Sequence, residues 1–324
     1  MRSDPWLAHA RLNQALDHVD AHLGGPLTTE DLARAVGWSV SSLHRAFVDV
    51  LECAPAGYVR QRRLDHAATL LCLHPRLRLA DVAVDCGFGA VEVFCRAFLK
   101  HFGMTAATWR DGGHRTWREA RLREHAASVR PARPLQAHPD WELRDSIPGR
   151  RLWYELDFRP RSDDPHELNV RVVDVPACRI VYSRAVGTYG NADALWRQHL
   201  RWCESMGLVH AATPMLATWL DDPSVTPVHR CRHDVGILVP ASQLPRCQAP
   251  SRLVPGGPRA VLDFSGPVEE LPYAWQWVAH RWMPRHARKP MRVTPYLLLR
   301  AGKLPALASG SLLSAQVCFS LGAA

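Results

Sequence analysis

The 324-residue sequence lacks several features that would mark an exported, membrane-bound or disulfide-linked protein. Its nine cysteines stand singly, with no C-x-x-C pair, which is typical of a cytosolic protein with reduced thiols. No basic segment followed by an apolar run opens the chain as in a signal peptide. Residues 304–324 carry no charge, but the proline, glutamine, serines and glycines among them argue against a membrane span. We therefore expect a cytoplasmic chain of two or three domains with no membrane partner.

Motifs of catalysis are missing as well. The sequence has no nucleophile elbow, no Walker-type phosphate loop and no paired metal-ligand spacing. His229, Cys231 and His233 alternate, so on a strand they would share one face that could hold a metal ion. Their spacing is not that of the usual metal sites, and a polar strand face is the favoured interpretation. We expect no enzyme activity, no catalytic residue, no cofactor and no metal.

The positive charge of the chain is not where a simple nucleic-acid interpretation would put it. The formal net charge is +9, but residues 1–112 balance 12 basic against 12 acidic side chains. Residues 166–324 carry 17 basic and 10 acidic side chains, so most of the surplus lies there. Charge alone therefore does not assign DNA binding to the N-terminal part, and the pattern of residues has to be used instead.

The first 52 residues have the pattern of short helices separated by glycine. Apolar residues between 12 and 23 repeat at helical spacing, and a glycine pair follows them. A short helix is predicted over 30–36, and Gly37 ends it. Ser39 then caps a helix over about 40–51. A short helix, a glycine turn and a second helix make a helix-turn-helix.

The same pattern recurs about 50 residues later. Residues 81–87 correspond to 31–37, and Phe88 follows as Trp38 does. Between the two units lies a helical stretch, 55–72, that would hold them apart as a rigid rod. The apolar residues that we expect in the core of these units include Leu43, Phe47, Phe94, Phe98 and Phe102.

The exposed start of the second helix in each unit would read DNA, because an α-helix fits the major groove and its N-terminal residues meet base edges. In the first unit these residues are Val40, Ser41, Ser42, His44 and Arg45. In the second unit they are Ala90, Val91, Glu92, Cys95 and Arg96. The second set has few donors, so we expect the first helix to read bases and the second to contact phosphates or thymine methyls. Phosphate candidates, each of which is alternatively a solvated helix face, are Arg60, Arg62, Arg63, Lys100 and His101.

Residues 28–71 and 79–110 resemble the DNA-binding domain of the AraC family. The matching words are "EDLARAVGWSVSSLHRAF", "PAGYVRQRRLDHAATLL" and "ADVAVDCGFGAVEVFCRAFLKHFGMT". The tandem arrangement and the linking helix make the resemblance specific. It implies a bacterial-type transcription regulator that binds double-stranded DNA, with RNA polymerase as an expected partner. Glu52 stands where the family usually has glycine, and Ala106 where it usually has proline.

A linker is predicted over residues 113–165. Its first part, 114–130, is rich in arginine and is compatible with an exposed helix, and four prolines between 131 and 148 mark an irregular connection. The basic residues are either a solvated linker surface or an arm that contacts DNA, and they include Arg115, Arg118, Arg121 and Arg123.

From residue 166 the pattern changes to alternation, which predicts strands. The segments "RIVYSRAVGTYGNADALW" and "RAVLDFSGPVEELPYAW" both run from a strand through glycine into a helix. Two such units joined edge to edge make an α+β pseudo-twofold domain with a ligand cleft at the seam. The predicted fold is therefore multidomain: an all-α tandem helix-turn-helix domain over 5–112, a linker over 113–165 and an α+β pseudo-twofold domain over 166–324.

Residues 169–296 resemble the GyrI-like small-molecule-binding domain, through "VPACRIVYSRAVGTYG", "DDPSVTPVHRCRHDVGILV" and "GGPRAVLDFSGPVEELPYAWQWV". The resemblance implies binding of a small aromatic or hydrophobic compound in an aromatic groove. Candidate lining residues, each alternatively a core residue, are Tyr189, Trp196, Trp219, Trp275 and Tyr296. Alternative functions for this domain are a protein-interaction module and a vestigial hydrolase-like domain.

Two departures from the second family concern the end of the chain. The late acidic residue that would neutralise a cationic ligand falls near Thr294, and no Asp or Glu follows Glu270. A buried cation without a carboxylate is unfavourable, so we expect weak or absent binding of lipophilic cations and a neutral or anionic ligand instead. The segment 301–324 also lacks the usual pattern of a final strand.

Overall fold

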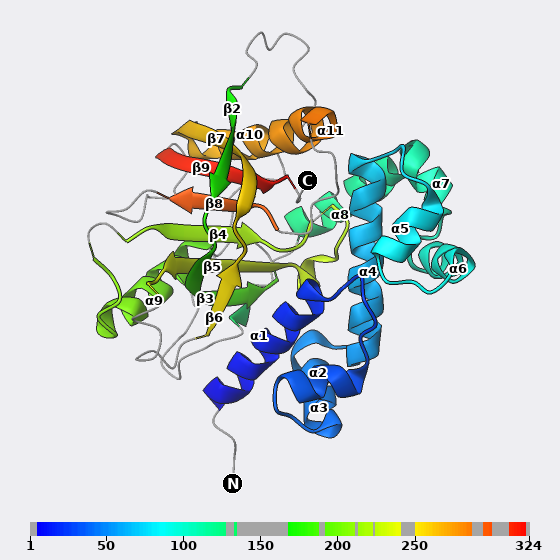
Figure 1. The fold of residues 1–324 in the computed structure, drawn as a ribbon, viewed down its shortest axis with the longest axis horizontal. Coiled ribbons are helices and arrows are strands. Elements are labelled where there is room, and N and C mark those ends of the chain that lie inside the picture. The colour runs from blue at the N-terminus through cyan, green and yellow to red at the C-terminus, as the bar shows by residue number, and fades with distance from the viewer. Residues whose placement is uncertain are drawn as a thin grey trace. The chain divides into compact units, whose positions relative to one another are not determined.

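The computed structural model describes residues 5–127, 133–134, 168–187, 192–210, 213–222, 224–240, 250–286, 294–299 and 311–321. They form a helical unit, which consists of residues up to Arg121 together with Asp222–Arg230, and a sheet unit that holds most of the rest (Figure 1). The predicted fold class is confirmed. Most of the predicted linker lies outside the described residues, so the domain boundaries stay a prediction. Among the described helices, none has the length and apolar character needed to cross a bilayer.

Two helix pairs lie at either end of a long helix in the helical unit (Figure 1). The first pair is α2 and α3, the second is α5 and α6, and α4 runs between them. The helix bounds are α1 (Pro5–Ala21), α2 (Thr29–Ala35), α3 (Val40–Leu51), α4 (Pro55–Leu73), α5 (Leu79–Asp85), α6 (Val91–Phe102), α7 (Ala106–Thr108) and α8 (His114–Ala127). Both predicted helix-turn-helix units and the linking rod are therefore confirmed.

The two pairs share the same core packing, as the repeat predicts. The ring of Phe47 in α3 meets Tyr58 in α4 edge-on, with centroids 5.5 Å apart and an interplanar angle of 79°. Phe98 in α6 meets Trp109 in the same way, at 5.7 Å and 81°. Trp109 also donates its indole N–H to the carbonyl of Ala68 at 3.0 Å, which ties the second pair to α4. All five predicted core residues of the two units are buried.

Local hydrogen bonds fix where α2 and α3 begin. The Thr28 hydroxyl accepts the N–H of Asp31 at 3.1 Å, and the Asp31 carboxylate accepts the N–H of Thr28 at 3.3 Å, which makes a reciprocal capping box. Ser39 accepts the N–H of Ser42 at 3.1 Å at the start of α3. Gly37, between the helices, has φ +64°, a left-handed backbone that favours glycine.

The sheet unit is one antiparallel sheet covered by helices. Its strand order is β1-β3-β5-β4-β8-β9-β7-β2, and β6 pairs with β3. The helices are α9 (Ala192–Ser205), α10 (Leu271–Trp277) and α11 (Met283–His286). The strand bounds are β1 (Arg133–Pro134), β2 (Val170–Val175), β3 (Cys178–Val186), β4 (Met215–Trp219), β5 (Arg232–Leu238), β6 (Ser251–Val254), β7 (Gly257–Pro267), β8 (Tyr296–Leu299) and β9 (Leu312–Ser320).

The predicted pseudo-twofold arrangement is present in the strand pairing. In the first half β5 lies between β3 and β4, with α9 between β3 and β4 in the sequence. In the second half β9 lies between β7 and β8, with α10 between β7 and β8 in the sequence. The two halves join where β4 pairs with β8, from Met215 opposite Leu299 to Thr218 opposite Tyr296.

The end of the chain corrects one expectation. Residues 312–320, where no final strand was expected, form β9, which lies between β7 and β8. Leu313, Ala315, Val317 and Phe319 alternate along it and pack in the main core of the sheet unit. Small and polar residues between them weaken the apolar signal, although the period of two is intact. The chain thus completes its sheet with this segment.

Candidate DNA-reading helices and ligand-binding sheet

The start of α3 presents the predicted base-reading residues to solvent. Ser41, His44 and Arg45 are exposed, whereas Leu43 and Phe47 on the other side of the helix are buried. Hydroxyl, imidazole and guanidinium groups are all able to hydrogen-bond base edges or phosphates. Val40 is also exposed, and an aliphatic side chain there is able to contact a thymine methyl. Ser42 differs from these four, because it is half-buried and its hydroxyl lies 2.9 Å from that of Ser39 in the helix cap.

The start of α6 is exposed like the start of α3 but presents different side chains. Glu92 and Arg96 are exposed, and Ala90 just before the helix is exposed as well. Val91 and Cys95 are half-buried. Arg96 occupies the position that Arg45 has in the first unit, and Glu92 is an acceptor that suits only a base donor such as the cytosine amino group. The helix therefore offers fewer contacts to a DNA base than α3 does.

The phosphate candidates separate into exposed and internally bonded residues. Arg60 on α4 and Lys100 on α6 are exposed. Arg62 instead pairs with Asp20 of α1 at 3.1 Å. Arg63 donates to the carbonyls of Leu23 at 3.0 Å and Gly25 at 2.6 Å. The structure thus uses Arg62 and Arg63 to hold α1 and the turn after it against α4.

His101 and Gly87 each contact another element of the helical unit. His101, another phosphate candidate, places its Nε2 3.6 Å from a carboxylate oxygen of Asp65 on α4. Gly87, in the turn of the second pair, has φ +74°, and a Cβ there would lie 2.6 Å from the Leu23 carbonyl oxygen. Only glycine therefore fits where the second turn approaches the end of α1 and the Arg63 side chain.

The spacing of the two helix pairs is set by α4. Its 19 residues make a rod about 28 Å long at 1.5 Å per residue. Successive major-groove segments on one side of B-DNA lie about 34 Å apart. A rod of this length with a helix pair at each end is on the scale that two adjacent groove segments require.

The predicted aromatic lining residues do not all come together. Trp219 and Trp275 meet edge-on with ring centroids 5.4 Å apart, and Trp275 contacts Phe319 at 5.0 Å. Trp196 on α9 is buried in the core between the helices and the sheet. Tyr296 pairs with Thr218, next to Trp219, so it lies on the opposite face of the sheet. Tyr189 lies outside the described residues.

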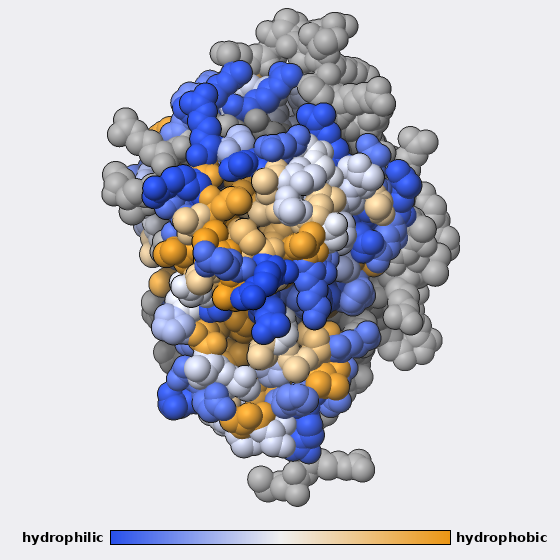
Figure 2. Space-filling model, turned by 90° about the vertical axis from the view of Figure 1, so that its right-hand side faces the viewer, coloured by the Kyte–Doolittle hydropathy of each residue, from blue (hydrophilic) through white to orange (hydrophobic). Residues whose placement is uncertain are grey.

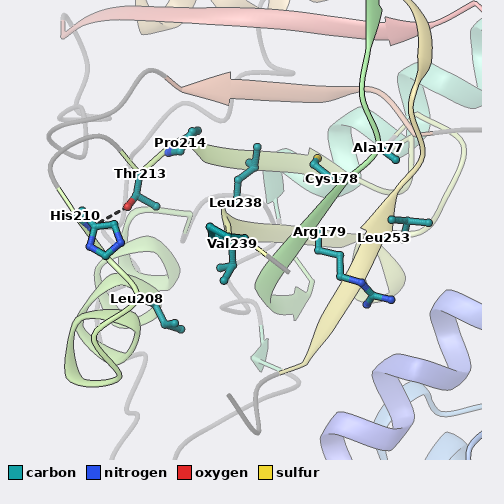
Figure 3. Close-up of a pocket in the computed structure, with 11 residues that line it drawn as sticks. Ala177, Cys178, Arg179, Leu208, His210, Thr213, Pro214, Leu238, Val239 and Leu253 are labelled. Atoms are coloured by element: carbon teal, nitrogen blue, oxygen red, sulfur yellow. Dashed lines mark hydrogen bonds between the residues drawn. The ribbon is translucent and has the colours of Figure 1, made fainter. Parts of the chain in front are cut away.

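A cleft of ≈ 630 Å³ lies where β3, β5 and β6 meet the loop before β4 (Figure 3). Its wall is mostly apolar, through Leu208, Leu238 and Leu253 among others. Arg179 and His210 add polar groups, and the backbone N–H of His210 donates to the Thr213 hydroxyl at 2.8 Å. None of the four candidates that the structure describes, Trp196, Trp219, Trp275 and Tyr296, belongs to this cleft.

The alternating His229, Cys231 and His233 do not share a strand as predicted. His229 lies in a 3-10 turn, Val228–Arg230, and β5 begins only at Arg232. Cys231 and His233 are buried. Across the described part of the chain, no group of three or more His, Cys, Asp or Glu side chains is placed to hold a metal ion.

Two family models match the sequence. One, described as a helix-turn-helix domain, matches residues 32–112, and the other, described as a GyrI-like small molecule binding domain, matches residues 168–296. The putative HTH-type transcriptional regulator YkgA of Escherichia coli K12 is 31% identical over 173 residues, which are 52% of this chain and 68% of that protein. The regulatory protein SoxS of Salmonella typhimurium is 32% identical over 105 residues, which are 32% of this chain and 97% of that protein. The chain belongs to the AraC family of transcriptional regulators.

A third relative is matched over only part of its length. The transcriptional regulator Rob of Salmonella typhimurium is 37% identical over 161 residues, which are 47% of this chain and 52% of Rob. The chain thus spans about half the length of Rob. Within the AraC family, this chain joins its helix-turn-helix units to a domain that matches the GyrI-like small molecule binding domain model.

One buried cluster in this AraC-family chain has the residue types of a hydrolytic site. The Ser183 hydroxyl lies 2.9 Å from Nδ1 of His199, and the Cys203 sulfur lies 3.4 Å from Nε2. All three are buried, and burial lowers the pKa of His199 to about 3. An imidazole with such a pKa is a poor general base at neutral pH. The arrangement is that of a core histidine satisfied by its neighbours.

Sequence reasoning missed two residues that the structure makes prominent. Phe319 joins the Trp219–Trp275 cluster from β9, and its alternation with Leu313, Ala315 and Val317 was the available signal. Arg259 on β7 is fully buried, and no local pattern marks a buried arginine in advance.

Proposed function

We propose that this regulator reads its operator through the start of α3 and uses α6 mainly for positioning. The observation that carries the proposal is the exposure of Ser41, His44 and Arg45 on a helix whose opposite side is anchored in the core. These groups include donors and acceptors for base edges, whereas α6 offers one arginine and one carboxylate. Arg60 and Lys100, exposed on α4 and α6, are the proposed phosphate contacts.

The proposed effector is a small hydrophobic or aromatic molecule bound by the sheet unit. Two features support it: the ring cluster of Trp219, Trp275 and Phe319, and the largely apolar cleft shown in Figure 3. Binding of the effector would change how the GyrI-like domain acts on the DNA-binding domain or on a further protein. A change in DNA occupancy requires that the effector bind the two states of the regulator with different affinity.

RNA polymerase is the proposed further protein partner, as the family resemblance implies. Apolar surface on the second helix pair supports a protein contact there, since Val84 on α5 is 68% exposed and Leu99 on α6 is 47% exposed. Figure 2, which views the molecule from the side of α5, α6 and α7, shows apolar residues lying between hydrophilic ones. Substitution V84S should weaken capture of purified RNA polymerase without changing DNA affinity.

The experiment that tests DNA reading is selection of bound sequences from random duplex DNA by the full chain. The salt concentration should be fixed at about 0.15 M, because phosphate contacts make affinity depend strongly on salt. A recovered consensus with one strongly specified segment and a weaker segment about one helical turn away supports the assignment. Recovery of unenriched sequences would overturn it.

A further inference from the structure

One face of the sheet carries arginine and tyrosine side chains within a small apolar cluster. A chain of cross-strand pairs runs over five strands of the sheet. It starts at Arg184 on β3, continues through Asp234 on β5, Thr218 on β4 and Tyr296 on β8, and ends at Cys318 on β9. Cross-strand partners point to the same side of a sheet, so these side chains form a row on one face. We name it the tyrosine face, because Tyr182 and Tyr296 lie in its apolar cluster, separate from the core that contains the helices.

Two arginine side chains share one carboxylate on the tyrosine face. Arg184 donates Nε and Nη2 to the two carboxylate oxygens of Asp234 at 2.7 and 2.8 Å, with both side chains buried. Arg252 Nη2 lies 3.3 Å from the same carboxylate and 3.3 Å from the Thr218 hydroxyl. Burial would raise the pKa of Asp234, but the charges of Arg184 and Arg252 outweigh it and hold that pKa below its usual value. The single carboxylate of Asp234 is therefore already shared by two guanidinium groups.

Arg259 adds a third guanidinium group, which has no carboxylate partner among the described residues. Its side chain on β7 is buried, with the residue 1% exposed, and its Cζ lies 5.7 Å from the ring centroid of Tyr296. Nη2 donates to the carbonyl of Pro255, whereas Nε and Nη1 have no hydrogen-bond partner among the residues that the structure describes. A buried charge without a counterion is strongly unfavourable. An anion at this place would relieve that cost.

The cleft of Figure 3 adjoins the tyrosine face at Cys178. Cys178 lines the cleft and also packs against the apolar cluster of the tyrosine face. Burial raises the pKa of the Cys178 thiol, and the charges of Arg259 and Arg252 lower it, so both guanidinium groups lie near this thiol. The rest of that wall includes Leu238 and Leu253, which suit an apolar group.

We propose that the sheet unit binds small organic acids, with the carboxylate held by the unpaired N–H groups of Arg259 beside Tyr296 and the apolar body in the adjoining cleft. This inference rests on the proposed effector function, because it names the chemical class of the effector. A cationic ligand would instead meet the guanidinium groups of Arg184, Arg252 and Arg259, and the Asp234 carboxylate is already shared by two of them. The absence of Asp and Glu after residue 270 agrees with this preference.

Calorimetric titration of the full chain tests the preference for acids. The three probes are 1-naphthoate, its neutral analogue 1-naphthalenemethanol and the lipophilic cation tetraphenylphosphonium. We expect the acid to bind about ten-fold or more tightly than the alcohol, since a charge-assisted hydrogen bond is the difference between them. We expect no measurable binding of the cation. Equal affinity for acid and alcohol, or tighter binding of the cation, overturns the proposal without any variant.

Substitution R259Q locates the site, and R171Q is its matched control. Arg171 is an exposed arginine on β2 that pairs with Asp263 at 2.6 Å, so the substitution R171Q removes one positive charge from the same sheet. We expect R259Q to lower acid affinity to that of the alcohol and R171Q to leave it unchanged. R252Q is the second variant if circular dichroism shows R259Q unfolded, and we expect it to weaken acid binding as well. Acid affinity that survives in a folded R259Q chain contradicts the assignment.

The outcome for DNA is independent of the outcome for acids. A chain that selects a DNA consensus but binds acid and alcohol equally retains the proposed DNA reading and loses the effector class. A chain that prefers the acid through Arg259 but enriches no DNA sequence retains the effector class and loses the proposed DNA reading.

Discussion

Glu52 and Gly103 end α3 and α6 at equivalent positions, and both have a left-handed backbone. Glu52 follows α3 with φ +57°, and its N–H donates to the Val48 carbonyl at 3.1 Å. Gly103 follows α6 with φ +69°, and its N–H donates to the Leu99 carbonyl at 2.9 Å. Only Glu52 carries a Cβ, which makes this conformation costly for an L-residue. The same helix end is thus strained in the first unit and relaxed in the second.

Substitution E52G should stabilise the helical unit by about 0.5–1 kcal/mol. The relief of left-handed strain exceeds the entropy that glycine adds to the unfolded chain. Thermal unfolding followed by circular dichroism at a helix-sensitive wavelength measures the change. The matched substitution G103A should lower stability by about 1 kcal/mol, because it introduces the same strain in α6. An E52G chain that unfolds at or below the wild-type temperature would count against the strain interpretation.

The helical domain could be predicted closely because its signals are local. The predicted helix over 40–51 matches α3, since Ser39 before it and the apolar spacing of Leu43, Phe47 and Leu51 act within the segment. The predicted joining of two strand–helix units was also correct, because the repeat is visible in sequence order. β9 was missed, since Ala315, Gln316 and Cys318 make its alternation weak compared with a typical buried strand.

The ligand-binding residues could not be predicted because the face on which each lies depends on strand register, which the sequence does not determine. Tyr296 and Trp219 were expected to line one groove, but Tyr296 pairs with Thr218, and a shift of one residue places a side chain on the other face. Arg63 shows the same limit in the helical unit. Its partners, the carbonyls of Leu23 and Gly25, lie about forty positions away in the sequence.

Substitution R45A should weaken operator binding by about 1–3 kcal/mol and relax specificity at one base position. Arg45 is exposed on α3 where base edges would be met. Substitution R96A, at the matching position of α6, should weaken binding to all sequences by a similar factor and reduce the salt dependence by about one phosphate contact. Titrations on the selected consensus and its single-base variants, at several salt concentrations, compare the two. If R45A preserves the full preference among base variants, Arg45 does not read a base.

Substitution R63Q should lower stability by about 1.5–3 kcal/mol, because the part-buried carbonyls of Leu23 and Gly25 lose a charged donor. We expect no change in the salt dependence of DNA binding, since this side chain is bonded internally. The control is R60Q, at an exposed position one turn away on α4. It should leave the free energy of unfolding unchanged and reduce the salt dependence of DNA binding. Urea unfolding and salt-dependent DNA titration of both variants separate the two roles. A reduced salt slope in folded R63Q would restore its assignment as a phosphate contact.

Two buried histidines make the sheet unit sensitive to mild acid. Burial lowers the pKa of His199 to about 3 and that of His233 to about 4, from an ordinary value of 6.5. Above about pH 6.5 both imidazoles are neutral in the folded and the unfolded chain, so they do not change stability with pH. Below about pH 6.5 the two histidines are protonated in the unfolded chain but stay neutral in the folded chain. The free energy of unfolding then falls by about 1.4 kcal/mol per pH unit for each histidine. This loss continues until the folded pKa values of about 4 and 3 are reached.

The slope can be assigned to one residue with H199Q. Between pH 5 and 6.5 most carboxylates remain ionised, so histidines dominate the change in stability. We expect the free energy of unfolding of H199Q to fall less steeply with acid than that of the wild type, by about 1.4 kcal/mol per pH unit. The control is H286Q, which alters an exposed histidine at the end of α11 and should keep the wild-type slope. Identical slopes for H199Q and the wild type would mean that His199 takes up its proton in the folded chain, which is incompatible with the burial that surrounds it.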